Sequence, residues 1–235
     1  MQIEIQEKAA SAFWLEKAIL LYRNDKETVA VEHDVRSKKG APPHLGPGRF
    51  VTTSFAEKLL RVMNKAPLQY VSPNVVAMSR HAVAWFEPAA ARVMYFTPDR
   101  DDAVAAFDGK RIPQPPLLFI ARERALSVYA LADNERPTLD SSLYAAPYWN
   151  IYGHQHHSVC LGTMVLPESI EPEQTAAWTD AFFRSNFTHL SGAKCWAHRG
   201  TYAELLADTV ALGRFKSEWL RPAGLTVAQA VKCDS

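Results

Sequence analysis

The chain has 235 residues, 48% of them hydrophobic, which is enough for a sizeable core in one domain or in one domain with an added lobe. Its 26 basic and 25 acidic residues leave a net charge of +1, so the sequence carries no electrostatic footprint for nucleic acid or a membrane surface. Three cysteines without framework spacing argue against a disulfide scaffold, and no apolar run is long enough for a membrane span. No secretory leader pattern opens the chain, so we expect a cytoplasmic protein.

The first part of the chain predicts a small β-rich extension. Residues 18–22 and 27–32 have strand composition and are separated by a polar turn, which indicates a hairpin. The Gly- and Pro-rich stretch 38–48 is expected to be a loop. Apolar residues at helical spacing predict a helix over about 52–63. We therefore expect residues 1–75 to form an N-terminal extension of hairpin and helix.

Two further pairs of strands are predicted in the middle of the chain. Strands 82–86 and 92–96 flank Glu87-Pro88 and indicate one hairpin, and strands 117–121 and 126–131 indicate another. Strands that follow one another through short turns favour an antiparallel meander over a parallel sheet. This meander would begin the core domain, predicted over residues 76–235.

The last third of the chain predicts an irregular segment and two helices. About twenty residues after Pro137 lack periodicity, and a long segment of this kind inside a domain is often functional. A helix begins near Glu171 and a final helix covers about 202–212. In the first of these helices, the residues expected to share one face are Ala176, Ala177, Asp180, Phe183 and Phe187. The predicted class is α+β, an antiparallel sheet with helices before and after it.

Cys160 is the first candidate for chemistry, because it follows a turn that contains His154, His156 and His157. A nearby positive charge favours the thiolate, which is the nucleophilic form. The alternative is an inert thiol, since free cysteine is among the most buried residue types. Asn150 could donate a hydrogen bond to a developing oxyanion, or it could simply shape a turn.

The same histidines allow a second interpretation, a metal site. Together with Cys160 they could hold zinc through nitrogen and sulfur ligands, although four ligands within seven positions is tighter than common zinc-finger spacings. We therefore predict no metal and no cofactor, and keep zinc as an alternative. Residues 185–189 end a helix and are expected to satisfy its backbone carbonyls.

The order of the elements resembles the ubiquitin-conjugating enzyme fold, in which a Pro-Pro element ends a strand and an asparagine precedes the catalytic cysteine in a long flap. More narrowly, the chain resembles the prokaryotic ubiquitin-conjugating-like family D, a bacterial branch. The segments that carry this resemblance are Leu45-Gly-Pro-Gly-Arg49, Val83-Ala-Trp85 with Arg92, Pro113-Gln-Pro-Pro-Leu117, Arg136-Pro-Thr138, Leu143-Tyr-Ala-Ala-Pro-Tyr-Trp-Asn150, Val159-Cys-Leu-Gly162 and Phe182-Phe-Arg-Ser-Asn-Phe-Thr-His189.

The resemblance implies a site and a set of partners. Cys160 would carry a small ubiquitin-like protein as a thioester, received from a ThiF-type activating enzyme in a plasmid-associated PRTRC system and passed to a protein target. Asn150 would stabilise the oxyanion, and His157, His154 and Tyr148 are candidate assisting residues. The alternative within the same fold is a non-catalytic binding module with an inert Cys160.

The flap departs from the eukaryotic pattern in three ways. Tyr148-Trp149 replaces the His-Pro pair, and Asn150 lies ten residues before Cys160, farther than in that pattern. His157 stands where a glycine is usual. Because about 1 Å of misplacement can cost roughly a hundredfold in rate, the Asn150 role depends on the geometry of the flap.

Overall fold

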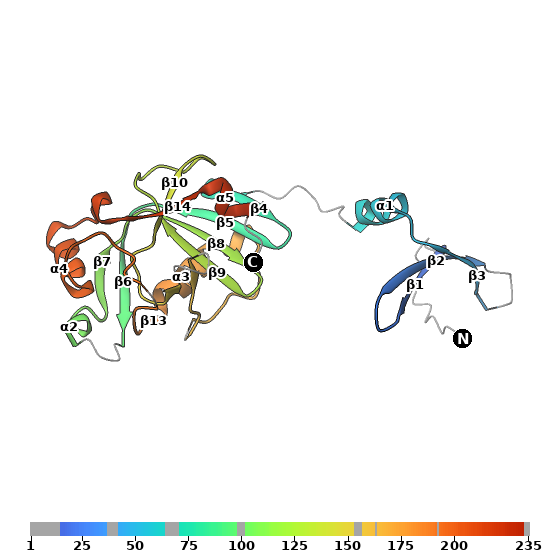
Figure 1. Cartoon of the computed structure of the whole chain (residues 1–235), viewed down its shortest axis with the longest axis horizontal. Coiled ribbons are helices and arrows are strands. Elements are labelled where there is room, and N and C mark those ends of the chain that lie inside the picture. Colours follow the sequence, from blue (N-terminus) through green and yellow to red (C-terminus); the bar gives the residue numbers. More distant parts are fainter. Residues whose placement is uncertain are drawn as a thin grey trace. The chain divides into compact units, whose positions relative to one another are not determined.

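The computed structural model describes residues 15–36, 42–63, 71–97, 102–152, 157–162, 164–191 and 193–232. The chain divides into two compact units, residues 1–69 and 70–235 (Figure 1). Among the described residues, none of the helices has the length and apolar character needed to cross a membrane.

The first unit contains a three-stranded antiparallel sheet in the order β1-β2-β3, followed by helix α1. Its elements are β1 Lys17–Arg23, β2 Thr28–Arg36, β3 His44–Phe50 and α1 Thr53–Met63. The predicted hairpin is confirmed: Asn24 Oδ1 in its turn accepts hydrogen bonds from two backbone N–H groups, those of Lys26 and Glu27, each at 2.8 Å. The predicted helix is also present.

The prediction of a loop over 38–48 is wrong for its second part, because β3 begins at His44 and pairs with β2. Pro47 fits this strand because β3 lies at the sheet edge, where a missing N–H costs no ladder bond. Gly48 fits because a Cβ there would come within 2.7 Å of the Val31 and His33 side chains. Gly and Pro therefore mark an edge strand here instead of a loop.

The second unit is organised around a large antiparallel sheet in the order β11-β12-β9-β8-β5-β4, with β10 pairing both β9 and β14. The predicted hairpin of β8 and β9 is confirmed, with Leu117 opposite Ala130. The sheet strands are β4 Val75–Ser79, β5 Ala82–Glu87, β8 Leu117–Arg122, β9 Ala125–Ala130, β10 Ser142–Ala145, β11 Ile151–Tyr152, β12 Ser158–Val159 and β14 Arg221–Thr226.

The other predicted hairpin, 82–86 with 92–96, is wrong. Both edges of β5 are occupied by β4 and β8, so the next strand, β6 (Ala91–Phe96), belongs to a different sheet. There β6 pairs antiparallel with β7 (Lys110–Pro113) and parallel with β13 (Asn186–Phe187). The parallel pair brings the segment after helix α3 (Thr175–Arg184) against the middle of the chain.

The helices of the second unit are α2 Asp102–Ala105, η1 Pro172–Gln174, α3 Thr175–Arg184, α4 Tyr202–Leu212, η2 Ser217–Trp219 and α5 Val227–Lys232. The helix predicted over about 202–212 is α4, and a reciprocal capping box between Thr201 and Glu204 starts it. It is not the final helix as predicted, because α5 follows it. The predicted face of α3 is wrong. Its buried residues are Thr175, Trp178, Thr179, Phe182 and Phe183, because the large aromatic side chains determine which side packs on the sheet.

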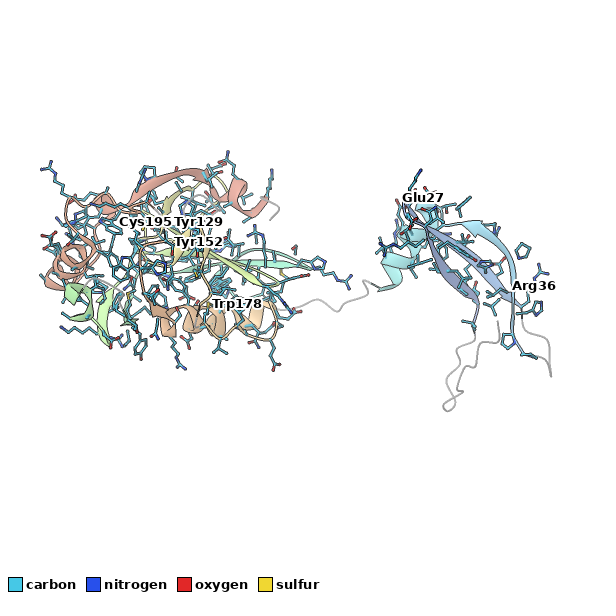
Figure 2. All side chains as sticks on the ribbon, turned by 60° about the horizontal axis from the view of Figure 1, so that its bottom comes forward. Glu27, Arg36, Tyr129, Tyr152, Trp178 and Cys195 are labelled. Carbon is cyan, nitrogen blue, oxygen red and sulfur yellow. The ribbon has the colours of Figure 1, made fainter. Side chains whose placement is uncertain are left out.

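Two hydrophobic cores lie on opposite faces of the large sheet (Figure 1). The main core packs the sheet against α3 and α4, where Trp85 stacks on Phe119 at 5.2 Å and Trp178, labelled in Figure 2, is fully buried. The smaller core lies beneath α5, which contributes Val227 and Ala230. This arrangement confirms the predicted α+β class.

Candidate thiol site around Cys160

Cys160 lies at the end of a short hairpin on the edge of the sheet. Strands β11 and β12 pair Ile151 with Val159, and beyond this pair the Cys160 N–H donates to the Asn150 carbonyl at 2.7 Å. Cys160 and Asn150 are therefore cross-strand neighbours. The β12 strand joins the rest of the sheet through one pair, Ser158 with Ser127.

Cys160 is the more accessible of the two free cysteines in the described part of the chain. The other, Cys195, is 8% exposed, and burial raises the pKa of its thiol to about 12. Its sulfur donates to the Tyr148 carbonyl at 3.5 Å. A thiol held in this way stays protonated near neutral pH, so Cys195 is unsuited to nucleophilic chemistry.

Tyr152 is the ionisable side chain nearest in register to the thiol. Residues 152 and 160 lie diagonally across the hairpin on one face, a spacing that aromatic side chains can bridge. A hydrogen bond with the Cys160 sulfur, together with the negative charge that sulfur carries when ionised, raises the pKa of the Tyr152 phenol. Tyr152 and Cys195 are labelled in Figure 2.

Asn150 ties the hairpin to the segment that follows α3. Its backbone has a φ of 62°, a left-handed conformation that asparagine tolerates better than most residues. Its amide Nδ2 donates to the Asn186 carbonyl at 2.8 Å, while Oδ1 accepts from Thr188 N at 3.4 Å and from Thr188 Oγ1 at 3.3 Å. Its own N–H donates to the His189 carbonyl at 3.2 Å. These bonds hold Asn150 against a distant segment of the chain and give its amide a structural role.

The segment 186–191 lies beside the hairpin and bonds Asn150 through Asn186, Thr188 and His189. Ser185, just before it, caps the helix by donating to Phe182 O at 2.7 Å, as expected for the end of α3. Beyond it, Thr188 Oγ1 donates to Asn150 Oδ1 and lies 2.9 Å from His189 Nδ1, while the buried Ser191 hydroxyl has no hydrogen-bond partner among the described residues. The sequence analysis missed Tyr152.

Tyr152 could not be found from the sequence alone. Strand alternation places it on the same face as the thiol only because Tyr152 pairs with Ser158, and that register comes from the structure.

Two of the candidate assisting residues are buried. Tyr148 packs among Phe182 and Phe183 in the main core, and burial raises its pKa well above the usual value. Within the described residues its hydroxyl has no hydrogen-bond partner. His157 is 7% exposed, with its ring 4.8 Å from that of Tyr129. His154, like His156, lies outside the described residues.

The zinc alternative keeps the status of a hypothesis. No group of three or more potential metal ligands occurs among the residues that the structure describes. Two of the four proposed ligands, His154 and His156, fall outside that part of the chain.

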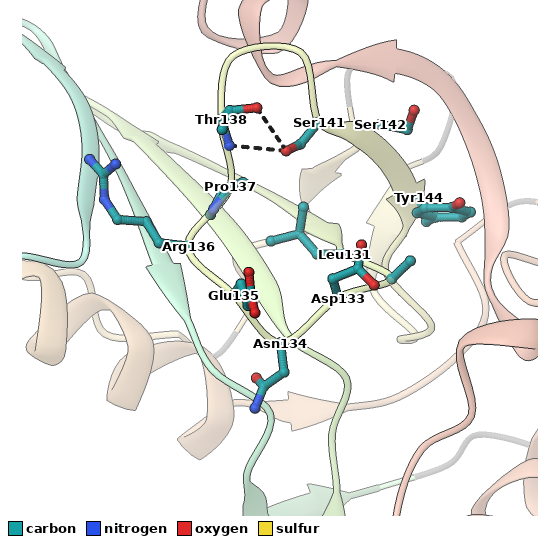
Figure 3. Close-up of a pocket in the computed structure, with 11 residues that line it drawn as sticks. Leu131, Asp133, Asn134, Glu135, Arg136, Pro137, Thr138, Ser141, Ser142 and Tyr144 are labelled. Atoms are coloured by element: carbon teal, nitrogen blue, oxygen red, sulfur yellow. Dashed lines mark hydrogen bonds between the residues drawn. The ribbon is translucent and has the colours of Figure 1, made fainter.

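A polar hollow of about 780 Å³ lies away from the thiol, where the chain leaves β9 (Figure 3). The Arg136 side chain is directed out of it and donates to the carbonyls of Pro73 and Val75 at 3.0 and 2.7 Å. Its lining residues are Leu131, Ala132, Asp133, Asn134, Glu135, Arg136, Pro137, Thr138, Ser141, Ser142 and Tyr144. The hollow is at the end of β9 opposite to the one that faces Cys160, and it is not part of the thiol site.

A family model for prokaryotic E2 family D matches residues 52–221. The chain belongs to this family. The match begins at α1 and contains the hairpin with Asn150 and Cys160, whereas β1, β2 and β3 precede it. No curated protein and no solved structure matches the chain. The protein is therefore ubiquitin-conjugating-like, as the quoted segments indicated.

Proposed function

We propose that this E2-like protein carries a small ubiquitin-like protein as a thioester on Cys160. The observation that carries the proposal is a partly exposed thiol, next to a phenol, at the end of a hairpin inside the region that matches the family. The Cys160 thiolate attacks the carbonyl carbon of the thioester that joins the ubiquitin-like protein to its activating enzyme. A new C–S bond forms, and the sulfur of the activating enzyme leaves as a thiolate.

The proposed partners follow from the family resemblance. They are a small ubiquitin-like protein, a ThiF-type activating enzyme that uses ATP, and a target that supplies an amine. The finer assignment, PRTRC system protein B, rests on the joint order of the quoted sequence segments. Co-occurrence of genes for these two partners beside the gene for this chain would support it, and their absence would count against it.

The direct test is reconstitution. The purified chain is mixed with the ubiquitin-like protein, the activating enzyme and ATP, and the products are separated without reducing agent. We expect an adduct that a thiol reagent removes, that Cys160→Ala abolishes and that Cys195→Ala preserves. An adduct that persists in Cys160→Ala would refute the assignment of Cys160.

One observation favours a second function, a non-catalytic binding module. The Asn150 amide is held by hydrogen bonds to Asn186 and Thr188, so the residue that the resemblance assigns to catalysis has a structural role. In this case Cys160 would resist alkylation in the native protein while the partners still bind. Rapid alkylation of Cys160 together with adduct formation would exclude the binding-module function.

A further inference from the structure

Thr188 connects two residues beside the thiol through one hydroxyl group. Its backbone N–H donates to Asn150 Oδ1 at 3.4 Å, which identifies that atom as the amide oxygen, and its Oγ1 donates to the same oxygen at 3.3 Å. The same Oγ1 lies 2.9 Å from His189 Nδ1. A hydroxyl has only one hydrogen to donate. Because Thr188 gives that hydrogen to Asn150, its oxygen accepts a hydrogen from His189.

The direction of this hydrogen bond determines the tautomer of His189. A neutral imidazole carries its hydrogen on one nitrogen and is basic at the other. Nδ1 is the donor toward Thr188 Oγ1, so Nε2 is the basic nitrogen. The His189 side chain is exposed, which makes it accessible to a substrate. General bases in enzymes share this arrangement, in which a second polar group orients the ring of the base.

Backbone hydrogen bonds place His189 near the thiol. The Asn150 N–H donates to the His189 carbonyl at 3.2 Å, and the Cys160 N–H donates to the Asn150 carbonyl at 2.7 Å. Backbones joined in this way lie about 5 Å apart, so those of Cys160 and His189 are separated by roughly 10 Å at most. A thioester carbonyl on the sulfur, an attacking amine and an imidazole together span such a distance. Cys160 is itself partly exposed.

We propose that His189 is the general base for transfer of an acyl group from Cys160 to an amine, and that Thr188 and Asn150 are positioning residues. Where the acyl group is a ubiquitin-like protein, this inference rests on the proposed function. The amine nitrogen attacks the thioester carbonyl carbon, a C–N bond forms, and His189 Nε2 takes the amine proton. The C–S bond then breaks, the sulfur leaves as a thiolate, and the imidazolium releases the proton to solvent.

The experiment measures acyl transfer from the native full-length chain without its partners. Cys160 is acylated with a small aryl thioester, free lysine is added, and loss of the acyl group from Cys160 is followed by mass spectrometry. Because a general base contributes about a hundredfold or more, His189→Ala is expected to slow transfer by about a hundredfold. Imidazole added to the solution should restore part of the rate, which it would not do for a purely structural defect.

The positioning role is tested at Thr188. Thr188→Val removes the hydroxyl from a side chain of the same shape and should slow transfer, whereas Thr188→Ser keeps the hydroxyl and should retain most of the rate. The matched control is His81→Ala, which removes an exposed histidine from the turn between β4 and β5, at the edge of the large sheet opposite to β11. It should leave the rate unchanged. Thermal unfolding of each variant shows that it is folded.

Three results would overturn the inference: transfer at the wild-type rate in His189→Ala, slowing that imidazole does not relieve, and a Cys160 that the aryl thioester cannot acylate. Equal slowing in His81→Ala would also count against it, since that would reflect a general change in the protein. The readout needs no partner protein, so it is independent of reconstitution. Slower transfer in His189→Ala without any ubiquitin-like adduct would refute the proposed function alone, and an adduct with unchanged transfer in His189→Ala would refute the base role alone.

Discussion

Replacement of Asn150 tests whether its amide is structural. Asn150→Ala removes the bond to the Asn186 carbonyl, which contributes about 1–1.5 kcal/mol, and two longer contacts with Thr188, which together contribute about 1 kcal/mol. Placing alanine at a φ of 62° costs roughly 1 kcal/mol more. We therefore expect the free energy of unfolding to fall by about 3 kcal/mol.

The matched variant is Asn150→Gly, which loses the same hydrogen bonds but adopts the left-handed backbone without steric cost. It should be about 1 kcal/mol more stable than Asn150→Ala. Urea unfolding followed by tryptophan fluorescence measures both differences. If Asn150→Ala lost less than about 1 kcal/mol while thioester discharge still fell sharply, the amide would act in the chemistry and the structural assignment would be refuted.

Three further predictions concern the same unit. Thr179→Val leaves the buried Trp85 Nε1–H without its acceptor and Glu87 without one donor, so it should destabilise the protein by about 1–3 kcal/mol in urea unfolding; an unchanged midpoint would contradict this. Hydrogen bonds from Thr201 hold the pKa of Glu204 below its usual 4.5, so the carboxylate stabilises the fold above that pH and its contribution is lost as the pH falls through the lowered value. Melting temperatures of wild type and Glu204→Gln should then differ near neutral pH and converge in acid, whereas a constant difference would argue against the linkage. With a pKa of about 12, Cys195 should resist alkylation in Cys160→Ala until the chain is unfolded; mass spectrometry distinguishes it from Cys233, and prompt labelling of Cys195 in the native variant would contradict this.

The parts of the fold that the sequence predicted are those determined by neighbours in the chain. The first hairpin has Asn24 to close its turn, and α4 has Thr201 and Glu204 at its start. Strands β8 and β9 are apolar runs joined by a short turn. In each case the turn or cap that sets the element is formed by residues close together in the chain.

The parts that the sequence analysis missed depend on distant contacts. Strand β6 has the composition of a hairpin partner for β5, but the edges of β5 are taken by β4 and β8. The parallel pairing of β13 with β6 joins residues about ninety positions apart, which local patterning does not encode.

The thiol site shows the same division between local contacts, which the sequence predicted, and distant contacts, which it did not. Cys160 and Asn150 were found because they lie in one short segment. The surroundings of the thiol were expected to come from histidines of that segment, yet His157 packs its ring against Tyr129. The described neighbours within the hairpin are Asn150 and Tyr152, whose places follow from the register. A register cannot be read until the cross-strand partner is known.

The hairpin that carries Cys160 is joined to strand β9 by the pair Ser158 with Ser127 and by a hydrogen bond from the Val128 N–H to the His157 carbonyl at 3.1 Å. The hairpin is also held by the Asn150 amide, which donates to the Asn186 carbonyl of strand β13. Strand β13 is itself paired with β6. The position of Cys160 therefore depends on contacts with two sheets, and a substitution that displaces Asn186 or Thr188 would move the backbone beside the thiol without removing any contact of the sulfur.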